Sequence, residues 1–146
     1  MKTRRINVRI LIVLASVAAI SAAAGFWGGV SAQGMLTAKE VYRKALTEVS
    51  GKEIRITDLS IPPGGTSPAH RHPGDTFVYV IEGEVQIGVD DNAPITAKAG
   101  EVVHEPPMSL HKTTLNPSKT DKTHAIAIMI IDADKQSTVA PGHADH

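Results

Sequence analysis

The sequence of 146 residues contains no cysteine. A disulfide framework, a thiolate metal ligand and a cysteine nucleophile are therefore excluded, so any bound metal must be held by nitrogen and oxygen ligands. An excess of charge of either sign is also missing, because 15 basic residues balance 15 acidic residues. This balance offers no electrostatic basis for a nucleic-acid partner. A chain of this length is expected to form one compact domain.

The first 32 residues have a composition typical of an export signal. A basic start, MKTRRINVR, precedes the long uncharged run ILIVLASVAAISAAAGFWGGV. Val30 and Ala32 place side chains of small to moderate size at the two positions that a signal peptidase recognises. Cleavage after Ala32 would leave a chain that begins near Gln33. The alternative is an uncleaved membrane anchor with its arginines on the cytoplasmic side. Either way the folded part is expected outside the cytoplasm, as a periplasmic, secreted or membrane-anchored protein.

Residues 33–50 form a lead-in segment in which Val41, Ala45, Leu46 and Val49 lie near helical spacing. We expect a helix over residues 37–49. The alternative is that this stretch lies extended against a sheet.

From Gly51 onwards the pattern changes to short strands separated by turn residues. The expected strands are residues 53–61, 76–81, 84–89, 95–98, 101–105 and 124–132, whereas residues 112–122 are expected to be a solvated loop. Many short strands with glycine and proline turns predict an antiparallel all-β sandwich or small barrel over residues 51–133. A flexible tail is expected over residues 134–146.

His70 and His72 stand one residue apart in the stretch PAHRHPGDTFVYVIEGEV. Alternate side chains of a strand share a face, so both imidazoles are expected to point the same way, toward a space that also contains Val78 and Val80. Histidine is the commonest metal ligand in proteins. The alternative is a pair of surface histidines in the loop beside Pro73-Gly74.

The surroundings of these histidines resemble the first motif of the cupin superfamily. That motif consists of a glycine, five residues, His-x-His, three or four residues, a glutamate, six residues and a glycine. Gly64, His70, His72 and Gly83 match these spacings, and Thr76 occupies the position of the glutamate.

The stretch GEVVHEPPMSLH resembles the second cupin motif. In that motif a glycine, five residues, Pro-x-Gly and two residues precede a histidine, and an asparagine follows three residues later. Gly100 and His111 match the pattern, whereas Met108 replaces the second glycine and Asn116 falls one residue late.

The resemblance covers about residues 51–133, and the gap between the two motifs is about as short as in small single-domain bacterial cupins. This resemblance implies an antiparallel jelly-roll β-barrel in which His70, His72 and His111 converge on one metal ion. Three neutral imidazoles bind divalent iron, manganese, nickel, copper or zinc and leave open positions for water, oxygen or substrate. The sequence does not distinguish among these metals.

The threonine at residue 76 is a weak neutral ligand compared with the glutamate that it replaces. Glu105 is the candidate substitute, as a carboxylate near the metal or as a general base, if its side chain points inward rather than to solvent. His104 has the opposite strand parity, so only one of the two residues faces the cavity in a regular strand. Phe77 and Tyr79 alternate with Val78 and are expected on the outside of the sheet.

Two classes of function fit this pattern. The first is a metal-dependent, dioxygenase-like enzyme that acts on a small organic molecule, with Glu105 moving a proton. The second is a non-catalytic barrel that binds or senses a small ligand at the cell envelope. A homodimer is a further hypothesis, because cupins commonly pair through their sheets. We expect no nucleic-acid partner, and contact with a membrane only through an uncleaved N-terminal segment.

Overall fold

The computed structural model describes residues 34–142. The expected export signal or anchor, residues 1–32, lies outside the described residues, as do His143 and His146 of the expected tail. Between residues 34 and 142, no helix has the length and apolar character needed to cross a membrane.

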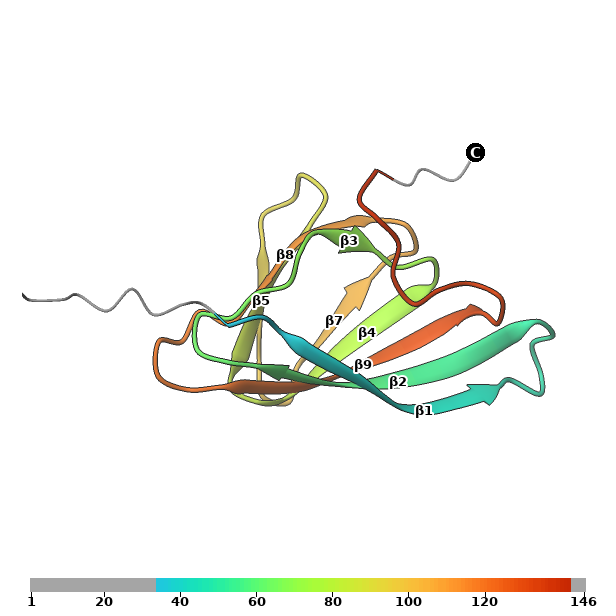
Figure 1. Ribbon diagram of the computed structural model, residues 1–146, viewed down its shortest axis with the longest axis horizontal. Coiled ribbons are helices and arrows are strands. Elements are labelled where there is room, and N and C mark those ends of the chain that lie inside the picture. The colour runs from blue at the N-terminus through green and yellow to red at the C-terminus, as the bar shows by residue number, and fades with distance from the viewer. Residues whose placement is uncertain (1–33, 143–146) are drawn as a thin grey trace, which may run out of the picture. The chain divides into compact units, whose positions relative to one another are not determined.

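The described chain forms nine strands in two sheets, and the named strands pair antiparallel (Figure 1). The strands are β1 (Thr37–Ala45), β2 (Lys52–Ile61), β3 (His70–Arg71), β4 (Asp75–Glu82), β5 (Glu84–Val89), β6 (Ile95–Lys98), β7 (Val102–Glu105), β8 (Leu110–Leu115) and β9 (Thr123–Asp132). One sheet has the order β1-β2-β9-β4-β7 and the other has the order β3-β8-β5-β6. The all-β, antiparallel prediction is confirmed.

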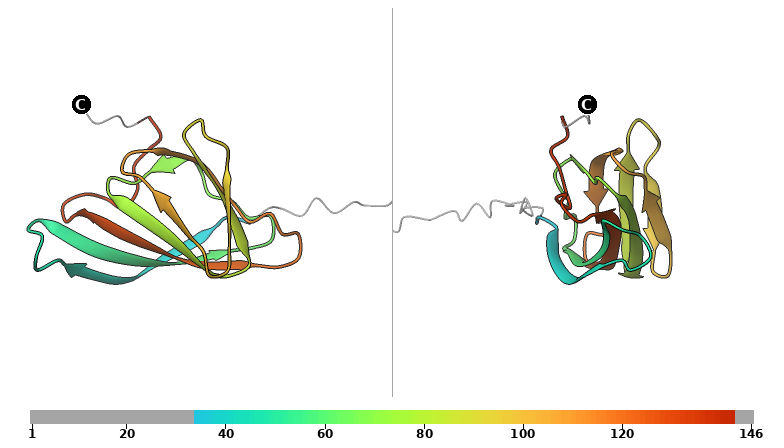
Figure 2. Two further views of the ribbon diagram at one scale, coloured as in Figure 1. Left: turned by 180° about the vertical axis from the view of Figure 1, so that it is seen from behind. Right: turned by 90° about the vertical axis from the view of Figure 1, so that its right-hand side faces the viewer.

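The hydrophobic core lies between the inner faces of the two sheets, which form two layers (Figure 2). Because side chains alternate along a strand, β4 buries Thr76, Val78 and Val80 on one side and turns Phe77 and Tyr79 to the other. The core cluster draws on both sheets and consists of Leu59, Ile61, Val78, Val80, Val85, Ile87, Val89, Ala97, Val103, Ala125 and Ala127.

The strand β8 lies where the sequence pattern predicts none, whereas the short strand β3 carries His70, one of the two histidines expected on a strand. β8 includes residues 112–115, so the prediction of a loop over residues 112–122 is wrong for these four residues. Lys112 is exposed, whereas His111 and Thr114 are buried between β3 and β5. Lys112 therefore lies on the exposed side of a strand, and the other charged residues of the expected loop, Lys119, Asp121 and Lys122, follow β8.

The helix expected over residues 37–49 is also wrong, because residues 37–45 form the edge strand β1. All nine residues of β1 are exposed, so the apolar side chains that suggested a helix are not buried against the domain, and burial of such a face is what stabilises most helices. Pairing with β2 instead provides partners for its backbone groups, with a bulge between Glu40 and Tyr42.

The outer surface of the five-stranded sheet is apolar from β1 to β7. Tyr79 is 41% exposed and Val102, its direct partner on β7, is 57% exposed. We call this surface the outer apolar face, and it consists of Tyr42, Ile54, Ile56, Phe77, Tyr79, Val102, Ile126, Ile128 and Ile130. Ion pairs such as Lys52 with Asp132 lie at its margin. Phe77 and Tyr79 thus lie on the outside, as the sequence predicts.

Candidate metal centre

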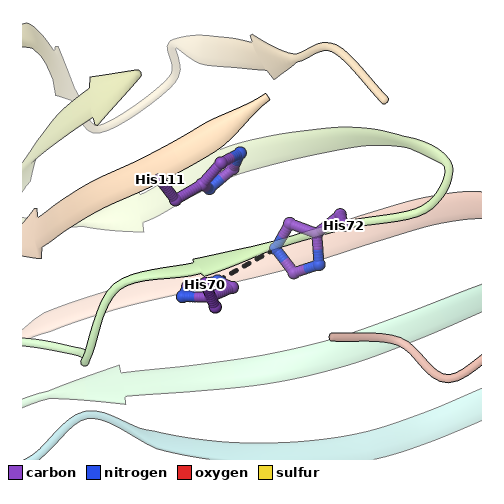
Figure 3. Close-up of side chains that lie close together, drawn as sticks. All are labelled: His70, His72 and His111. Carbon is purple, nitrogen blue, oxygen red and sulfur yellow. Dashed lines mark hydrogen bonds between the residues drawn. The ribbon is translucent and has the colours of Figure 1, made fainter. Parts of the chain in front are cut away.

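Three histidines converge at one end of the space between the sheets (Figure 3). His70 lies on β3, His72 follows that strand, and His111 lies on β8 directly opposite His70 in the β3–β8 pair. One nitrogen atom from each ring lies within 4.8 Å of the other two. The structure thus brings together the three residues that the cupin resemblance identifies as metal ligands.

Backbone carbonyl groups determine which nitrogen of His70 and of His72 carries the proton. The Nδ1 atom of His70 is 2.8 Å from the oxygen of Pro68, and that of His72 is 2.6 Å from the oxygen of Ser137. A carbonyl oxygen only accepts hydrogen bonds, so both rings carry their proton on Nδ1 when neutral. Their Nε2 lone pairs then face each other across 3.2 Å, which the dashed line in Figure 3 marks.

His111 is 1% exposed, and within residues 34–142 neither of its ring nitrogens makes a hydrogen bond. A buried polar atom without a partner costs free energy of about 1–3 kcal/mol, so such atoms are rare in native proteins. A divalent ion between the rings would provide a partner for a His111 nitrogen and for both facing Nε2 atoms. The donor set therefore fits a transition metal.

Burial lowers the pKa of His72 to about 4. The hydrogen bond to Ser137 and the nearby charge of Glu105 act in the opposite direction, but burial has the larger effect. His72 is therefore neutral at physiological pH, as a metal-binding imidazole must be.

Glu105 points into the same site from β7 and is 2% exposed. Its Oε1 atom lies 3.2 Å from Nδ1 of His111, in a direction that does not meet hydrogen-bond geometry, and its Oε2 atom lies 3.6 Å from Nε2 of His72. His104 points to the opposite side, where its ring stacks on Phe77 and hydrogen bonds with Asp75.

Thr76, at the position of the motif glutamate, is fully buried. Its hydroxyl group donates a hydrogen bond to the oxygen of Gly74 at 3.3 Å. Thr76 is also the direct partner of Glu105 in the antiparallel β4–β7 pair. Directly paired residues share a face of the sheet. The carboxylate of Glu105 therefore enters the site from β7, the strand next to β4, where the motif glutamate would lie.

A cavity of about 530 Å³ opens beside the histidines. Its walls are mainly apolar, and its polar lining includes His70, His72 and Glu105. The apolar lining includes Leu36, Leu59, Ile61, Val78, Val85, Ala127 and Met129. A volume of this size suits a small organic molecule.

Ser137 and Thr138 also line this cavity, although sequence analysis assigns them to a flexible tail. As far as residue 142, this segment is hydrogen-bonded to β2 and β3. No motif in residues 134–142 indicates a role in the site. Arg55, which holds this segment, alternates with Ile54 and Ile56 like an ordinary outward-facing polar residue of a strand, so the sequence does not mark it either.

Met108 has a backbone φ of 60°, a left-handed conformation that favours glycine. It occupies the glycine position of the second motif, so the turn keeps its shape despite the substitution. Asn116 is fully buried, and its side-chain amide donates hydrogen bonds to the oxygens of Ile61, Pro62 and Asp121. Its role is therefore to hold the turns at that end of the domain.

The fold and the site thus define an antiparallel β-barrel of two sheets in which three histidines that could hold a metal ion converge beside an apolar cavity. The cupin domain model matches residues 57–129, and the chain belongs to this family. No curated protein matches the sequence.

Solved structures of cupins share the fold. A cupin 2 conserved barrel domain protein from Salinispora arenicola is 24% identical, with a TM-score of 0.52 over 67% of this chain and 76% of that one. A cupin domain from Bordetella pertussis is 21% identical, with a TM-score of 0.51 over 67% of this chain and 95% of that one. A protein with a double-stranded β-helix domain from Klebsiella pneumoniae is 18% identical, with a TM-score of 0.56 over 69% of this chain and 80% of that one.

The metal-free protein is expected to lose stability as the pH falls from about 6.5 toward 4. The pKa of His72 is 6.5 before burial and about 4 in the fold, so the unfolded state binds more protons between these values. The free energy of unfolding then decreases with falling pH, by up to about 3 kcal/mol. Urea unfolding across this pH range measures the effect. His72→Gln should remove that part of the pH dependence, and an equal dependence in both proteins would contradict the assignment.

Proposed function

We propose that His70, His72 and His111 together bind one divalent transition metal. The supporting observation is the pair of Nε2 atoms 3.2 Å apart, each on a ring whose Nδ1 atom is bonded to a carbonyl. Two facing lone pairs repel unless a proton or a cation lies between them, and burial of His72 disfavours the extra proton. The candidates are iron, manganese, nickel, copper and zinc.

We further propose that the site acts on a small organic molecule as a metal-dependent, oxygenase-like enzyme. When bound, the metal would supply Lewis acidity and open positions for substrate or oxygen. The apolar walls of the cavity would hold the hydrocarbon part of the molecule and exclude water from it. The polar part would then lie beside His70 and Glu105.

Glu105 has two roles in this proposal. Its negative charge offsets part of the charge of a divalent ion in an apolar surrounding, where an uncompensated charge is costly. Its carboxylate also lies close enough to the cavity to take a proton from a bound molecule and return it.

A non-catalytic function is the second candidate, in which the barrel binds or senses a small ligand. The hydroxyl group of Thr76, bonded to Gly74, offers no charge where the motif has a glutamate. Metal content without turnover of any small organic acid or alcohol would favour this alternative.

The location of this activity outside the cytoplasm is also a proposal. It is supported by the basic start, the apolar run and the small residue Ala32 in the first 32 residues. Protein prepared with its own leader from an exporting host is therefore the appropriate material for metal analysis, and its intact mass reports where the chain begins.

Replacing any one of His70, His72 or His111 by alanine is expected to remove most of the bound metal, because each supplies one of three ligands. Elemental analysis of protein prepared without a histidine tag measures the metal content. His124→Ala is the matched control, since that ring lies away from the site and contacts Asp58. Equal metal content in all four variants would contradict the proposal.

Glu105→Gln is expected to weaken metal binding by roughly 10- to 100-fold and to abolish turnover, because it removes the buried negative charge while keeping the side-chain shape. Adding Thr76→Glu should restore binding, since the two positions are direct partners with Cβ atoms about 5 Å apart. Metal titration in competition with a chelator measures both effects.

Asp75→Asn is the control for this experiment, because the Asp75 side chain is exposed and bonded to His104 on the outer side of the sheet. An unchanged metal affinity in Glu105→Gln would show that its carboxylate does not act on the metal.

We propose that a second copy of this chain covers the outer apolar face. Five strands about 4.8 Å apart and three rows of side chains about 7 Å apart cover roughly 500 Å², and the nine residues of the outer apolar face occupy a little more than half of these positions. With its charged margin, this approaches the roughly 800 Å² that each partner of a stable complex buries. The margin carries both basic and acidic side chains, so the margins of two copies can be complementary when two such faces meet across a two-fold axis.

Tyr79→Lys combined with Val102→Lys is expected to convert this dimer into a monomer, because like charges would meet inside the interface. Light scattering after size-exclusion chromatography measures the mass. Ile95→Lys is the control, since Ile95 is 50% exposed on β6, in the other sheet. A wild-type monomer, or a double variant that stays dimeric, would refute the proposed interface.

A further inference from the structure

The chain that follows β9 lies along the edge of the metal centre. We call residues 133–141 the strap. Two backbone hydrogen bonds join Val139 of the strap to Arg71 of β3, at 3.0 and 3.1 Å, and Ser137 and Thr138 form part of the cavity wall. Figure 1 shows the strap passing from the end of β9 to β3. The strap therefore connects the far end of β2 and β9 to the strand that carries His70.

Arg55 of β2 anchors the first half of the strap. Its Nη1 atom donates to Oγ of Ser137 at 3.0 Å, and its Nη2 atom donates to the backbone oxygen of Lys135 at 2.8 Å. The Nη2 atom also lies 3.5 Å from the oxygen of Ala133. Nε donates to the carboxylate of Glu53, two residues earlier on the same strand. Each nitrogen of the guanidinium group therefore has a partner.

This arginine is 2% exposed and Glu53 is 7% exposed. A buried ion pair is weak evidence for stability, because apolar residues of similar volume often stabilise a fold as well or better. The planar fork of an arginine, in contrast, can hold several acceptors in a defined arrangement. The contacts of Arg55 thus indicate a positioning role.

Ser137 links Arg55 to the metal centre. Its hydroxyl oxygen accepts a hydrogen bond from Arg55, and its backbone oxygen accepts one from Nδ1 of His72 at 2.6 Å. The acceptor that keeps the proton of His72 on Nδ1 therefore belongs to a residue held by Arg55. Such bonds to the second nitrogen fix both the tautomer and the orientation of metal-binding imidazoles.

We propose that Arg55 is a positioning residue for His72 and acts through Ser137 of the strap. By holding the strap in place, Arg55 keeps the His72 proton on Nδ1 and directs the Nε2 lone pair toward Nε2 of His70. The metal-binding part of this inference rests on the proposed function, whereas the effect on the tautomer exists in the metal-free protein.

Arg71 holds the second half of the strap independently of Arg55. Its backbone pairs with Val139, and its Nε atom donates to the oxygen of Pro141 at 2.9 Å. Loss of the Arg55 contacts should therefore loosen residues 133–137 without detaching the strap. The expected change is local to Ser137 and His72.

Arg55→Lys in the full chain tests the proposal. A lysine keeps the positive charge beside Glu53 but cannot hold Ser137 and Lys135 together. In the metal-free variant, long-range ¹H–¹⁵N spectra of the imidazoles are expected to show His72 shifted from the single Nδ1–H tautomer of the wild type to a mixture. Titration with Co²⁺ is expected to show binding weakened by about 10- to 100-fold, with an altered visible absorption spectrum.

Arg43→Lys is the matched control, because Arg43 lies 3.6 Å from the same Glu53 carboxylate, is about half exposed and makes no bond to the strap. Its tautomer and Co²⁺ affinity should equal those of the wild type. If Arg55→Lys does not fold, Ser137→Ala removes only the Arg55 Nη1 contact, and a partial shift of the same tautomer is expected.

A folded Arg55→Lys with the wild-type tautomer would overturn the positioning role. A folded Ser137→Ala with the wild-type tautomer would do so as well if Arg55→Lys cannot be prepared. Wild-type protein that binds no Co²⁺ would instead refute the proposed metal site, and the tautomer measurement would still decide the role of Arg55. The two failures are thus distinguishable.

Discussion

His72, His111 and Glu105 are buried beside an apolar cavity together with the half-buried His70, and neighbouring segments provide hydrogen-bond partners for some of their polar atoms. A buried polar atom costs free energy unless it finds a partner. In His70 and His72 one ring nitrogen of each, Nδ1, has a partner in the backbone oxygen of Pro68 or Ser137. The remaining nitrogens and the carboxylate of Glu105 face one another within a few ångströms. A cation at that point would give a partner to the two facing Nε2 atoms, to one nitrogen of His111 and to the carboxylate of Glu105.

The antiparallel register of β4 and β7 explains how this carboxylate reaches the site. Thr76 and Glu105 are direct partners, so their side chains leave the sheet on the same face and at nearly the same height. A carboxylate can therefore reach the site from either of two paired positions on neighbouring strands, here from β7 instead of β4. The fully buried threonine leaves the space that the longer side chain of Glu105 enters.

One part of the five-stranded sheet buries charged side chains on its inner side and leaves apolar side chains partly exposed on its outer side. At the first half of β2 the inner side carries Glu53 and Arg55, whereas the outer side carries Ile54 and Ile56. The inner pair can be buried because the strap provides acceptors for the guanidinium group. The outer isoleucines continue across β9 to Tyr79 and Val102. One strand thus contributes to both the strap contact and the outer apolar face.

The sequence by itself determined the fold class, most strand positions and the three histidines. Alternation within β4 and β9 and each of the two cupin-like motifs are properties of short stretches, whereas the set of His70, His72 and His111 is what the resemblance of both motifs to cupins implies. The alternation in β2 was ambiguous, because Ile54 and Ile56 have the opposite parity to Leu59 and Ile61. A period of two shows that two faces exist but does not tell which one is buried.

Only the tertiary structure decided which residues meet across the site. β1 became a strand because β2 offered an edge, whereas its own residues have no buried face. Glu105 faces His111 because β7 pairs with β4 in one register, and Ser137 meets His72 because two distant arginines hold the strap. These contacts join residues far apart in the chain, where local propensity and spacing carry no information about distance.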